Sequence, residues 1–168
     1  MTKLRIAGII RESIVDGPGI RFVIFAQGCT HNCPGCHNPD THDVNGGYNV
    51  SIDTIIEEIK KNPLLSGVTF SGGDPFLQAK SFSELAKKIH ELGLNVISYT
   101  GYTIEQLING INKNPDWKNL LLQTDTLVDG PFILDRKSLS LKFMGSSNQR
   151  IIDPKKSLKS GYAIEKNF

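Results

Sequence analysis

Apolar residues in this chain follow two alternating patterns. Short runs rich in β-branched and aromatic residues predict strands, and longer stretches with an apolar residue at every third or fourth position predict amphipathic helices. The expected strands cover residues 21–27, 67–71, 94–99, 120–128 and 139–144, with a further edge strand at residues 4–10. Because strands and helices alternate along the chain, the pattern predicts an α/β fold with a largely parallel sheet.

Polar residues mark the starts of the helices between these strands. Ser51 precedes an apolar-periodic run. Ser81 is followed three residues later by Glu84, and Thr103 is followed three residues later by Gln106. A hydroxyl residue with Glu or Gln at this distance is the capping-box pattern of a helix N-terminus. We therefore expect one helix to begin at each of these three positions.

Each of the five expected parallel strands is followed by a segment rich in glycine, polar residues or cysteine. These segments are residues 29–36, 72–75, 100–102, 129–131 and 145–149. Parallel sheets bind ligands at the carboxyl ends of their strands, where successive loops converge. Five strands are too few for a closed eight-stranded barrel. We therefore expect an open partial (βα) barrel with its site at one edge of the sheet.

The composition is typical of one folded domain that spans residues 1–168. Of the 168 residues, 39% are hydrophobic, which is enough for a single core. Lysines gather in residues 154–168, and we expect this segment to form an irregular tail.

The charge distribution excludes several function classes. The formal net charge is +2, and no helix carries a dense Lys/Arg stripe with interleaved aromatic residues, so nucleic-acid binding is not expected. Charged residues at Lys3, Arg5, Arg11 and Glu12 interrupt the first apolar positions. We therefore expect no signal peptide, no membrane span and a cytoplasmic location.

The three cysteines of the chain, Cys29, Cys33 and Cys36, lie in one short segment. An odd number of cysteines in one segment cannot cross-link a fold, so they indicate a site. A cubane iron–sulfur cluster has four irons, and three thiolates leave one iron without a protein ligand. The spacing therefore predicts a cluster whose open iron can bind a substrate.

Zinc is the first alternative, because His31, His37 and His42 lie close to the cysteines. Structural zinc sites usually take two ligand pairs from separate turns, and this sequence has no second cysteine pair. A redox-active thiol pair is the other alternative. Three cysteines from one loop suit three corners of a cubane, so the pattern favours the cluster while both alternatives stay open.

The C-x3-C-x2-C spacing, in a loop after the first parallel strand, resembles the signature of the radical S-adenosylmethionine superfamily. The resemblance implies one [4Fe-4S] cluster held by Cys29, Cys33 and Cys36, with S-adenosylmethionine bound to the open iron. The reduced cluster then cleaves S-adenosylmethionine to methionine and a 5′-deoxyadenosyl radical. Gly35, Cys36 and His37 would complete the cofactor pocket.

A second segment, Gly72-Gly73-Asp74, resembles the glycine-glycine-acid motif of the same superfamily, which approaches the methionine amino group. Glycines let the backbone come close to a ligand, and a carboxylate can pair with an ammonium group. An ordinary turn after a strand is the alternative interpretation. The resemblance also makes Asp129, at a strand end, part of the S-adenosylmethionine pocket.

Further segments are similar to the activating proteins of anaerobic (class III) ribonucleoside-triphosphate reductase. They are residues 16–21, 33–38, 100–102, 128–130 and 145–150. The chain departs from that family at Met144, where an arginine is usual. Arg21 and Arg150 are expected to be surface or structural charges and not catalytic groups.

This resemblance implies an enzyme that leaves a glycyl radical on a partner protein. The implied partner is the large subunit of anaerobic ribonucleoside-triphosphate reductase, and the implied electron donor is a flavodoxin-type protein. Activases of pyruvate formate-lyase share residues 16–21 and the cysteine spacing, so they are a second enzyme interpretation. A zinc-stabilised binding module is the non-enzymatic alternative.

Overall fold

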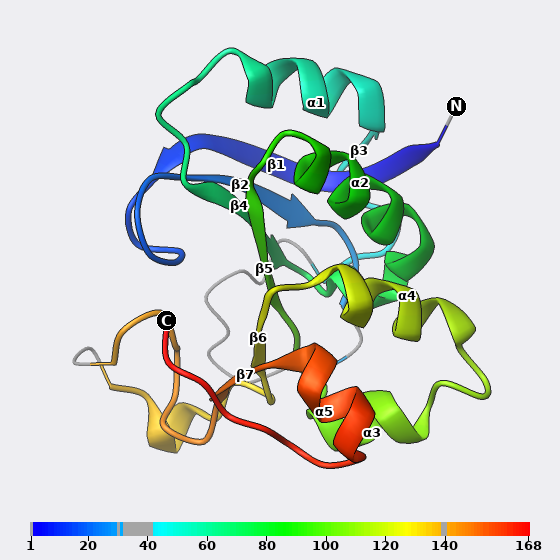
Figure 1. Cartoon of the computed structure of the whole chain (residues 1–168), viewed down its shortest axis with the longest axis vertical. Helices are drawn as coiled ribbons and strands as arrows, with labels where there is room; N and C mark the ends of the chain where they lie inside the picture. Colours follow the sequence, from blue (N-terminus) through cyan, green and yellow to red (C-terminus); the bar gives the residue numbers. More distant parts are fainter. Residues whose placement is uncertain (1, 30, 32–41, 139–140) are drawn as a thin grey trace.

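The structure is a computed structural model that describes residues 2–29, 31, 42–138 and 141–168. A seven-stranded sheet flanked by helices forms its centre (Figure 1). The strands are β1 (Lys3–Ser13), β2 (Arg21–Ala26), β3 (Tyr48–Ser51), β4 (Gly67–Gly72), β5 (Asn95–Tyr99), β6 (Thr126–Asp129) and β7 (Arg150–Ile152). The helices are α1 (Ile52–Lys60), α2 (Ala79–Glu91), α3 (Ile104–Asn109), α4 (Pro115–Gln123) and α5 (Pro154–Ser160), with short 3-10 helices η2 (Pro75–Gln78) and η3 (Leu134–Arg136).

The strand order in the sheet is β3-β1-β2-β4-β5-β6-β7. Strands β2, β4, β5 and β6 run parallel to one another, and β1 and β7 pair antiparallel with the two outer members of this group. Strand β3 pairs antiparallel with β1 and so runs in the direction of the parallel group. The sheet stays open between its edges β3 and β7. The predicted α/β fold, an open partial barrel with a largely parallel sheet, is confirmed.

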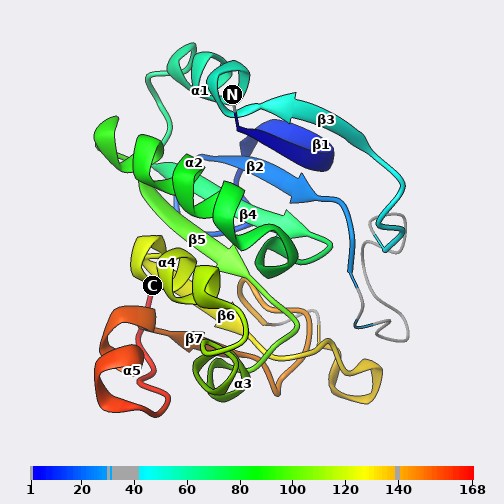
Figure 2. The same ribbon diagram turned by 90° about the vertical axis from the view of Figure 1, so that its right-hand side faces the viewer.

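Helices cover one face of this sheet, and Figure 2 shows α2 and α4 in front of the strands. Val68 and Phe70 of β4 are buried on this face, where the ring of Phe70 lies 4.8 Å from that of Phe82 in α2. Successive strand residues point to opposite faces. Thr69 and Ser71 therefore lie on the other face, and the site described below uses that face.

Two of the three predicted helix starts are confirmed. The Ser51 side chain caps α1, and Thr103 caps α3 with both hydrogen bonds of a capping box. Helix α2 begins at Ala79 and not at Ser81, because η2 leads directly into it. None of the helices in the described ranges is long and apolar enough to cross a membrane.

The predicted strand at residues 120–128 is wrong over its first half. Residues 120–123 belong to α4, and the strand pairing is confined to β6. Pro115 occupies the first turn of α4, where proline favours a helix start, and Leu120 and Leu121 are buried. A short apolar run fits a buried strand or a helix face equally well, and here packing against α2 decides for the helix.

The predicted strand at residues 139–144 is wrong in its described part, and residues 139–140 lie outside the described residues. Residues 141–144 form no strand, because Phe143 has a left-handed φ of 62° that a strand cannot contain. The predicted edge strand at residues 4–10 is confirmed within the longer β1. The sheet also gains β3 and β7, two short strands that the sequence pattern did not indicate.

Residues 154–168 are not the irregular tail that their lysines indicated, because α5 fills the first seven of them. Asp153 accepts a hydrogen bond from the amide of Lys156 at 3.0 Å, and a proline occupies the first turn. Leu158 packs against the core. An aspartate followed by proline is a helix start signal. The prediction of an irregular tail relied on the lysines and did not use this signal.

Candidate active site

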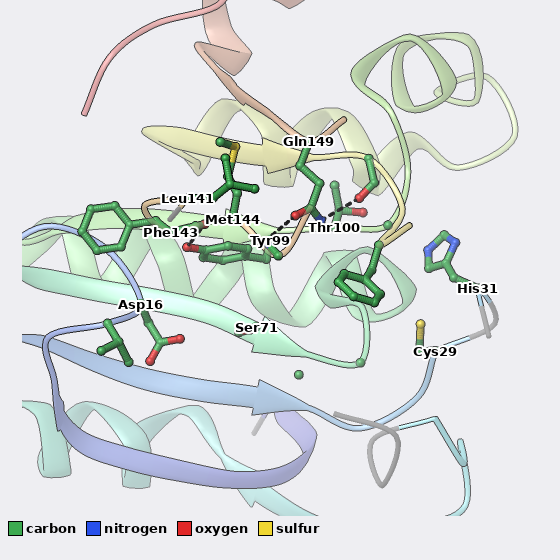
Figure 3. A pocket seen from close by; sticks show the side chains of 17 residues that line it. Asp16, Cys29, His31, Ser71, Tyr99, Thr100, Leu141, Phe143, Met144 and Gln149 are labelled. Atoms are coloured by element: carbon green, nitrogen blue, oxygen red, sulfur yellow. Dashed lines mark hydrogen bonds between the residues drawn. The ribbon is translucent and has the colours of Figure 1, made fainter. Parts of the chain in front are cut away.

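A cavity of about 390 Å³ opens at the carboxyl ends of β4 and β5 (Figure 3). Small-molecule sites in proteins commonly have volumes of about 300–1,000 Å³. All five segments predicted to follow strands contribute to its lining, through Cys29, Gly72, Gly101, Gly130 and Gln149, although residues 145–149 lead into β7 and do not follow a strand in the described part of the chain. The predicted convergence of these loops at one edge of the sheet is therefore confirmed.

The cysteine segment reaches the cavity through Cys29, which is half-buried just after β2. Its amide donates a hydrogen bond of 3.1 Å to the carbonyl of His42, which brings Cys29 and His42 together. The imidazole Nε2 of His42 is buried and has no hydrogen-bond partner in the described part of the chain. The remaining predicted residues of this segment lie outside the described residues; they are Cys33, Gly35, Cys36 and His37.

Gly72 and Gly73 form a backbone wall of the cavity. Gly72 has a φ of +88°, and a Cβ at this position would stand 2.6 Å from the backbone nitrogen of Ala26. The amide of Gly73 donates to the carbonyl of Ala26 at 2.7 Å. Only glycine fits position 72 without a backbone shift. Both predicted glycines therefore lie where a ligand can approach the main chain.

Asp74 lies behind this wall and does not line the cavity, because its side chain is fully buried. Oδ1 accepts the amide hydrogen of Phe76 at 3.0 Å, and Oδ2 accepts that of Gly101 at 3.0 Å. The Thr100 hydroxyl lies within 3.0 Å of both oxygens. Pairing with an ammonium group would need this carboxylate at the cavity surface. Here it ties the loop after β4 to the loop after β5.

His31, two residues beyond Cys29, approaches the same carboxylate. Its Nε2 lies 2.7 Å from Oδ2 of Asp74, and its side chain is 15% exposed. The ring stands edge-on to Tyr102, with a centroid distance of 4.5 Å and an interplanar angle of 79°. The sequence marked His31 only as a neighbour of the cysteines. The contact with Asp74 could be found only in three dimensions, because 43 positions separate the two residues.

Asp129 ends β6, but its carboxylate is also fully buried. It accepts the amide hydrogen of Ile104 at 2.7 Å and two hydrogen bonds from the Arg150 guanidinium at 3.1 and 2.6 Å. Hydrogen bonds with Glu105 and Asp129 raise the pKa of Arg150 above its usual value. The next residue, Gly130, lines the cavity. Arg150 is thus a structural charge, as expected.

Asp16 and Tyr99 also line the cavity. The Tyr99 hydroxyl donates to the carbonyl of Phe143 at 2.7 Å. Burial, together with the charge of Asp16, raises the pKa of Tyr99 above its usual range, so the phenol stays neutral. The Asp16 carboxylate accepts a hydrogen bond from the Ser13 hydroxyl at 2.6 Å.

The sequence analysis also missed an apolar wall of the cavity, formed by Phe132, Leu141, Phe143 and Met144. Met144 stands where arginine is usual in the resembled family, so this chain has a thioether in the wall at that place. Apolar residues in a loop carry no periodicity, and the sequence therefore gave no signal for them.

The segment at residues 145–149 is held in place by its own side chains. Gln149 accepts the amide hydrogen of Gly145 at 2.7 Å and donates to the carbonyl of Gly130 at 3.1 Å. Asn148 donates to another carbonyl of the loop after β6 at 2.8 Å. These bonds join the last two loops, so the polar residues of this segment shape the rim of the cavity.

Arg21, at the start of β2, is only 1% exposed and is therefore structural and not a surface charge. Its guanidinium donates to the Thr69 hydroxyl at 2.8 Å, the Val68 carbonyl at 2.9 Å and the Asn95 side chain at 2.7 Å. Burial lowers the pKa of Arg21 to about 10. Thr69 in turn donates to the carbonyl of Asp16 at 2.8 Å. Arg21 thus supports the loop that carries Asp16 into the cavity.

Comparisons with known proteins agree with this geometry. The family described as a 4Fe-4S single cluster domain matches residues 15–152. The anaerobic ribonucleoside-triphosphate reductase-activating protein of Escherichia coli (strain K12) is 34% identical over 145 residues, which are 81% of this chain and 90% of that protein. The protein of the same name from Vibrio cholerae is 32% identical over 147 residues, with 82% and 90% covered.

Two further proteins are less completely matched. The pyruvate formate-lyase-activating enzyme of Listeria monocytogenes is 32% identical over 158 residues, which cover 89% of this chain and 61% of that enzyme. The crystal structure of QueE from Escherichia coli aligns with a TM-score of 0.47 and 16% identity, covering 60% of this chain and 53% of the other.

The matched cluster domain contains the cysteine segment, the glycine wall and the last loop, so it includes almost the whole lining of the cavity. The reductase-activating proteins are matched along 90% of their own length at 32–34% identity. The family match runs from the loop before β2 to β7. The chain therefore belongs to the family of anaerobic ribonucleoside-triphosphate reductase-activating proteins.

Proposed function

We propose that this chain is a radical S-adenosylmethionine enzyme that activates an anaerobic ribonucleoside-triphosphate reductase by generating a glycyl radical on it. One observation carries the proposal: Cys29 and the glycine wall of Gly72 and Gly73 line the same cavity at the sheet edge. The relatives are named for their action on the reductase.

The proposed cofactors are one [4Fe-4S] cluster, held by Cys29, Cys33 and Cys36, and S-adenosylmethionine. Cys29 fits this role because it is one of the cavity-lining residues. Held by these residues, the cluster would supply the one electron needed to cleave S-adenosylmethionine to methionine and a 5′-deoxyadenosyl radical, and that radical would take a hydrogen atom from a glycine of the reductase. Residues of this chain bind S-adenosylmethionine and orient it for cleavage.

We assign the methionine end of S-adenosylmethionine to the backbone of Gly72 and Gly73, which is open to the cavity. Gly35, Cys36 and His37 complete the pocket on the cluster side. The apolar wall that includes Phe132 and Phe143 suits the adenine base, because aromatic rings offer a large apolar contact surface.

Asp74 and Asp129 serve the same pocket from behind its lining. Each carboxylate is fully buried and accepts hydrogen bonds from segments that line the cavity or adjoin it. We assign both to loop positioning, because neither is a lining residue.

The large subunit of the reductase is the proposed partner, in preference to pyruvate formate-lyase. The chain matches 90% of the length of the reductase-activating proteins but 61% of a pyruvate formate-lyase-activating enzyme. A one-electron donor such as flavodoxin is needed to reduce the cluster. We place the reaction in the cytoplasm, where thiolates stay reduced.

The proposal is tested by anaerobic reconstitution with iron and sulfide, followed by an assay for reductant-dependent 5′-deoxyadenosine. We expect cleavage in the reconstituted protein and none in the Cys36→Ala or Cys29→Ala variant. Electron paramagnetic resonance then detects a glycyl radical after incubation with a candidate reductase or with pyruvate formate-lyase. Absence of cleavage in the reconstituted protein, or full cleavage in Cys36→Ala, would contradict the proposed mechanism.

A zinc-stabilised module is the remaining alternative. The observation in its favour is the buried Nε2 of His42 near Cys29, which has no hydrogen-bond partner among the residues that the structure describes. Metal analysis separates the two. A bound cluster gives a brown protein with about four irons per chain, and a zinc site gives a colourless protein with one zinc.

A further inference from the structure

We propose that His31 is a positioning residue, which anchors the cysteine segment to the sheet edge through its hydrogen bond with the buried Asp74. The inference rests on the proposed function, because the cysteine segment needs a defined position only if it holds a cluster. It differs from the superfamily expectation for Asp74, since it assigns this carboxylate to the protein's own loops and not to the ligand.

The hydrogen bonds around Asp74 determine which atom of His31 carries a proton. Oδ1 accepts from the Phe76 amide, Oδ2 accepts from the Gly101 amide, and the Thr100 hydroxyl shares its one proton between the two oxygens. Oδ2 lies 2.7 Å from Nε2 of His31 as well. A carboxylate only accepts hydrogen bonds, so we assign the shared proton to Nε2.

Burial makes this bond costly to lose. The Asp74 side chain has no solvent exposure, and His31 is 15% exposed. A buried carboxylate without enough donors carries a large desolvation penalty. Within the described ranges, four residues form hydrogen bonds with the Asp74 carboxylate, and they come from the cysteine segment, η2 and the loop after β5. His31 is the one that brings the cysteine segment into this group.

The surroundings of the imidazole hold it in one place. A Cβ on Gly101 would stand 2.5 Å from the His31 ring, so the ring occupies the space that a side chain at position 101 would need. Tyr102 closes the other side of the ring at a centroid distance of 4.5 Å. The next two residues after Thr100 thus form a slot that fits His31.

The place of His31 in the sequence gives this slot its consequence. His31 lies two residues after Cys29 and two residues before Cys33. An anchor at His31 would limit how far the two proposed ligands on either side of it can move. The same anchor reaches the glycine wall through Asp74, which directly follows Gly73. Together with the hydrogen bond from the Asp74 amide to the Gly28 carbonyl at 2.8 Å, this buried contact would therefore hold cluster and S-adenosylmethionine at a constant spacing.

Four variants test this assignment. His31→Gln keeps an N–H donor at a similar reach, and His31→Leu removes it at similar size. Gly101→Ala pushes the ring from its slot without altering the imidazole or the carboxylate. Gly8→Ala is the matched control, because a Cβ there meets nothing within 4 Å.

The first readout uses metal-free protein and needs no activity. Long-range proton–nitrogen spectra at neutral to alkaline pH should show His31 protonated at Nε2 in the unaltered chain and in Gly8→Ala. In Gly101→Ala this signal should shift toward that of a solvent-exposed histidine. A wild-type His31 with its proton at Nδ1 alone would overturn the proposal, whatever the protein does with iron.

The second readout uses reconstituted protein. We expect His31→Leu and Gly101→Ala to keep a native circular dichroism spectrum but to lose at least about threefold in retained iron, or to lose the change that S-adenosylmethionine causes in the paramagnetic resonance spectrum of the reduced cluster. His31→Gln should restore more than half of the lost signal. Wild-type values in His31→Leu would contradict the proposal.

Asp74→Asn combined with His31→Leu completes a double-mutant cycle. If the two residues act through one bond, the double variant loses no more iron than the worse single variant. Fully additive losses would contradict the coupling. Failure of the wild-type chain to take up iron would instead reject the proposed function, and the metal-free spectra would still decide the His31–Asp74 bond.

Discussion

Asp74 and Asp129 each follow a parallel strand, and each is fully buried behind the cavity lining. Each accepts hydrogen bonds from segments distant in sequence, including the Gly101 amide for Asp74 and the Arg150 guanidinium for Asp129. A carboxylate in such a position affects a site by keeping its loops at a defined spacing. Its substitution should therefore change stability as well as activity.

The first prediction compares the two acidic partners of Arg150. Asp129→Asn should destabilise the protein by about 2–3 kcal/mol, because it leaves part of a buried ion pair unmatched. Glu105→Gln should cost less than about 1 kcal/mol, since the Glu105 side chain is 48% exposed and water screens its charge. Urea unfolding monitored by circular dichroism measures both. Equal losses in the free energy of unfolding for the two variants would show that burial of Asp129 does not strengthen its contribution to stability.

The second prediction concerns the pH dependence of stability at Tyr99. Burial raises the pKa of Tyr99, whereas tyrosine in an unfolded chain ionises near pH 10. Above about pH 10 the unfolded state therefore binds fewer protons than the folded state, and the free energy of unfolding falls as the pH rises. Below that pH the contribution is fully present.

Tyr99→Phe should remove this part of the alkaline loss. The stability difference between the unaltered chain and the variant should shrink above pH 10, by at most about 1.4 kcal/mol per pH unit for one proton. Urea unfolding across this range measures it, with Tyr162→Phe at an exposed position as the control. A stability difference independent of pH would contradict the buried neutral phenol.

Residue types at the site could be read from the sequence, but their partners could not. The strand-end positions of Gly72, Gly73, Asp74 and Asp129 were predictable because strands and turns leave local signals. The bonds of Asp74 to His31 and of Asp129 to Arg150 join positions 43 and 21 residues apart. Such contacts depend on strand order, and a single sequence does not specify that order.

At the scale of an element, the third prediction concerns the carboxyl end of β4. Gly72→Ala should destabilise the protein by more than about 2 kcal/mol, because a positive φ is strained for alanine and its Cβ meets backbone atoms of β2. It should also abolish S-adenosylmethionine binding, since the wall it forms must shift. Isothermal titration and urea unfolding measure the two effects.

Gly161→Ala is the matched control for this prediction. Gly161 ends α5 with a φ of +81°, close to that of Gly72, but a Cβ there meets nothing within 4 Å. The variant should therefore show the cost of backbone strain alone, about 1 kcal/mol. Equal losses for Gly72→Ala and Gly161→Ala would mean that contact with β2 is unimportant.

Elements with strong local signals were predicted well, and those decided by packing were not. The caps at Ser51 and Thr103 locate α1 and α3 from a few residues. Helix α4 was taken as a strand because Leu120–Leu122 carry no helical period by themselves. Strand β7 is three residues long and exists through its pairing with β6, which no local pattern shows.

At the scale of the whole molecule, the fourth prediction concerns metal removal. Among the described residues, the hydrophobic core is built from strands and helices and does not include Cys29. Chelation of iron should therefore leave a folded, cooperatively unfolding protein with an unchanged far-UV circular dichroism spectrum. Loss of secondary structure on chelation would contradict this and would favour a metal-stabilised module.

The fold class was predictable at this scale, while the edges of the sheet were not. Alternating strand and helix patterns indicate a parallel α/β sheet, since this order leaves few other arrangements. The antiparallel strands β1 and β7 flank the parallel group, and no local pattern in the sequence specifies which strand each of them pairs with.

The hydrogen bonds of Asp74 join the loops that follow β2, β4 and β5 into one unit. Anyone who wishes to transplant the cysteine loop of a related enzyme into this scaffold should therefore exchange three segments together. A donor loop without a histidine at position 31 would leave the Asp74 carboxylate without one of its hydrogen-bond donors. A residue larger than glycine at position 101 would displace the His31 ring.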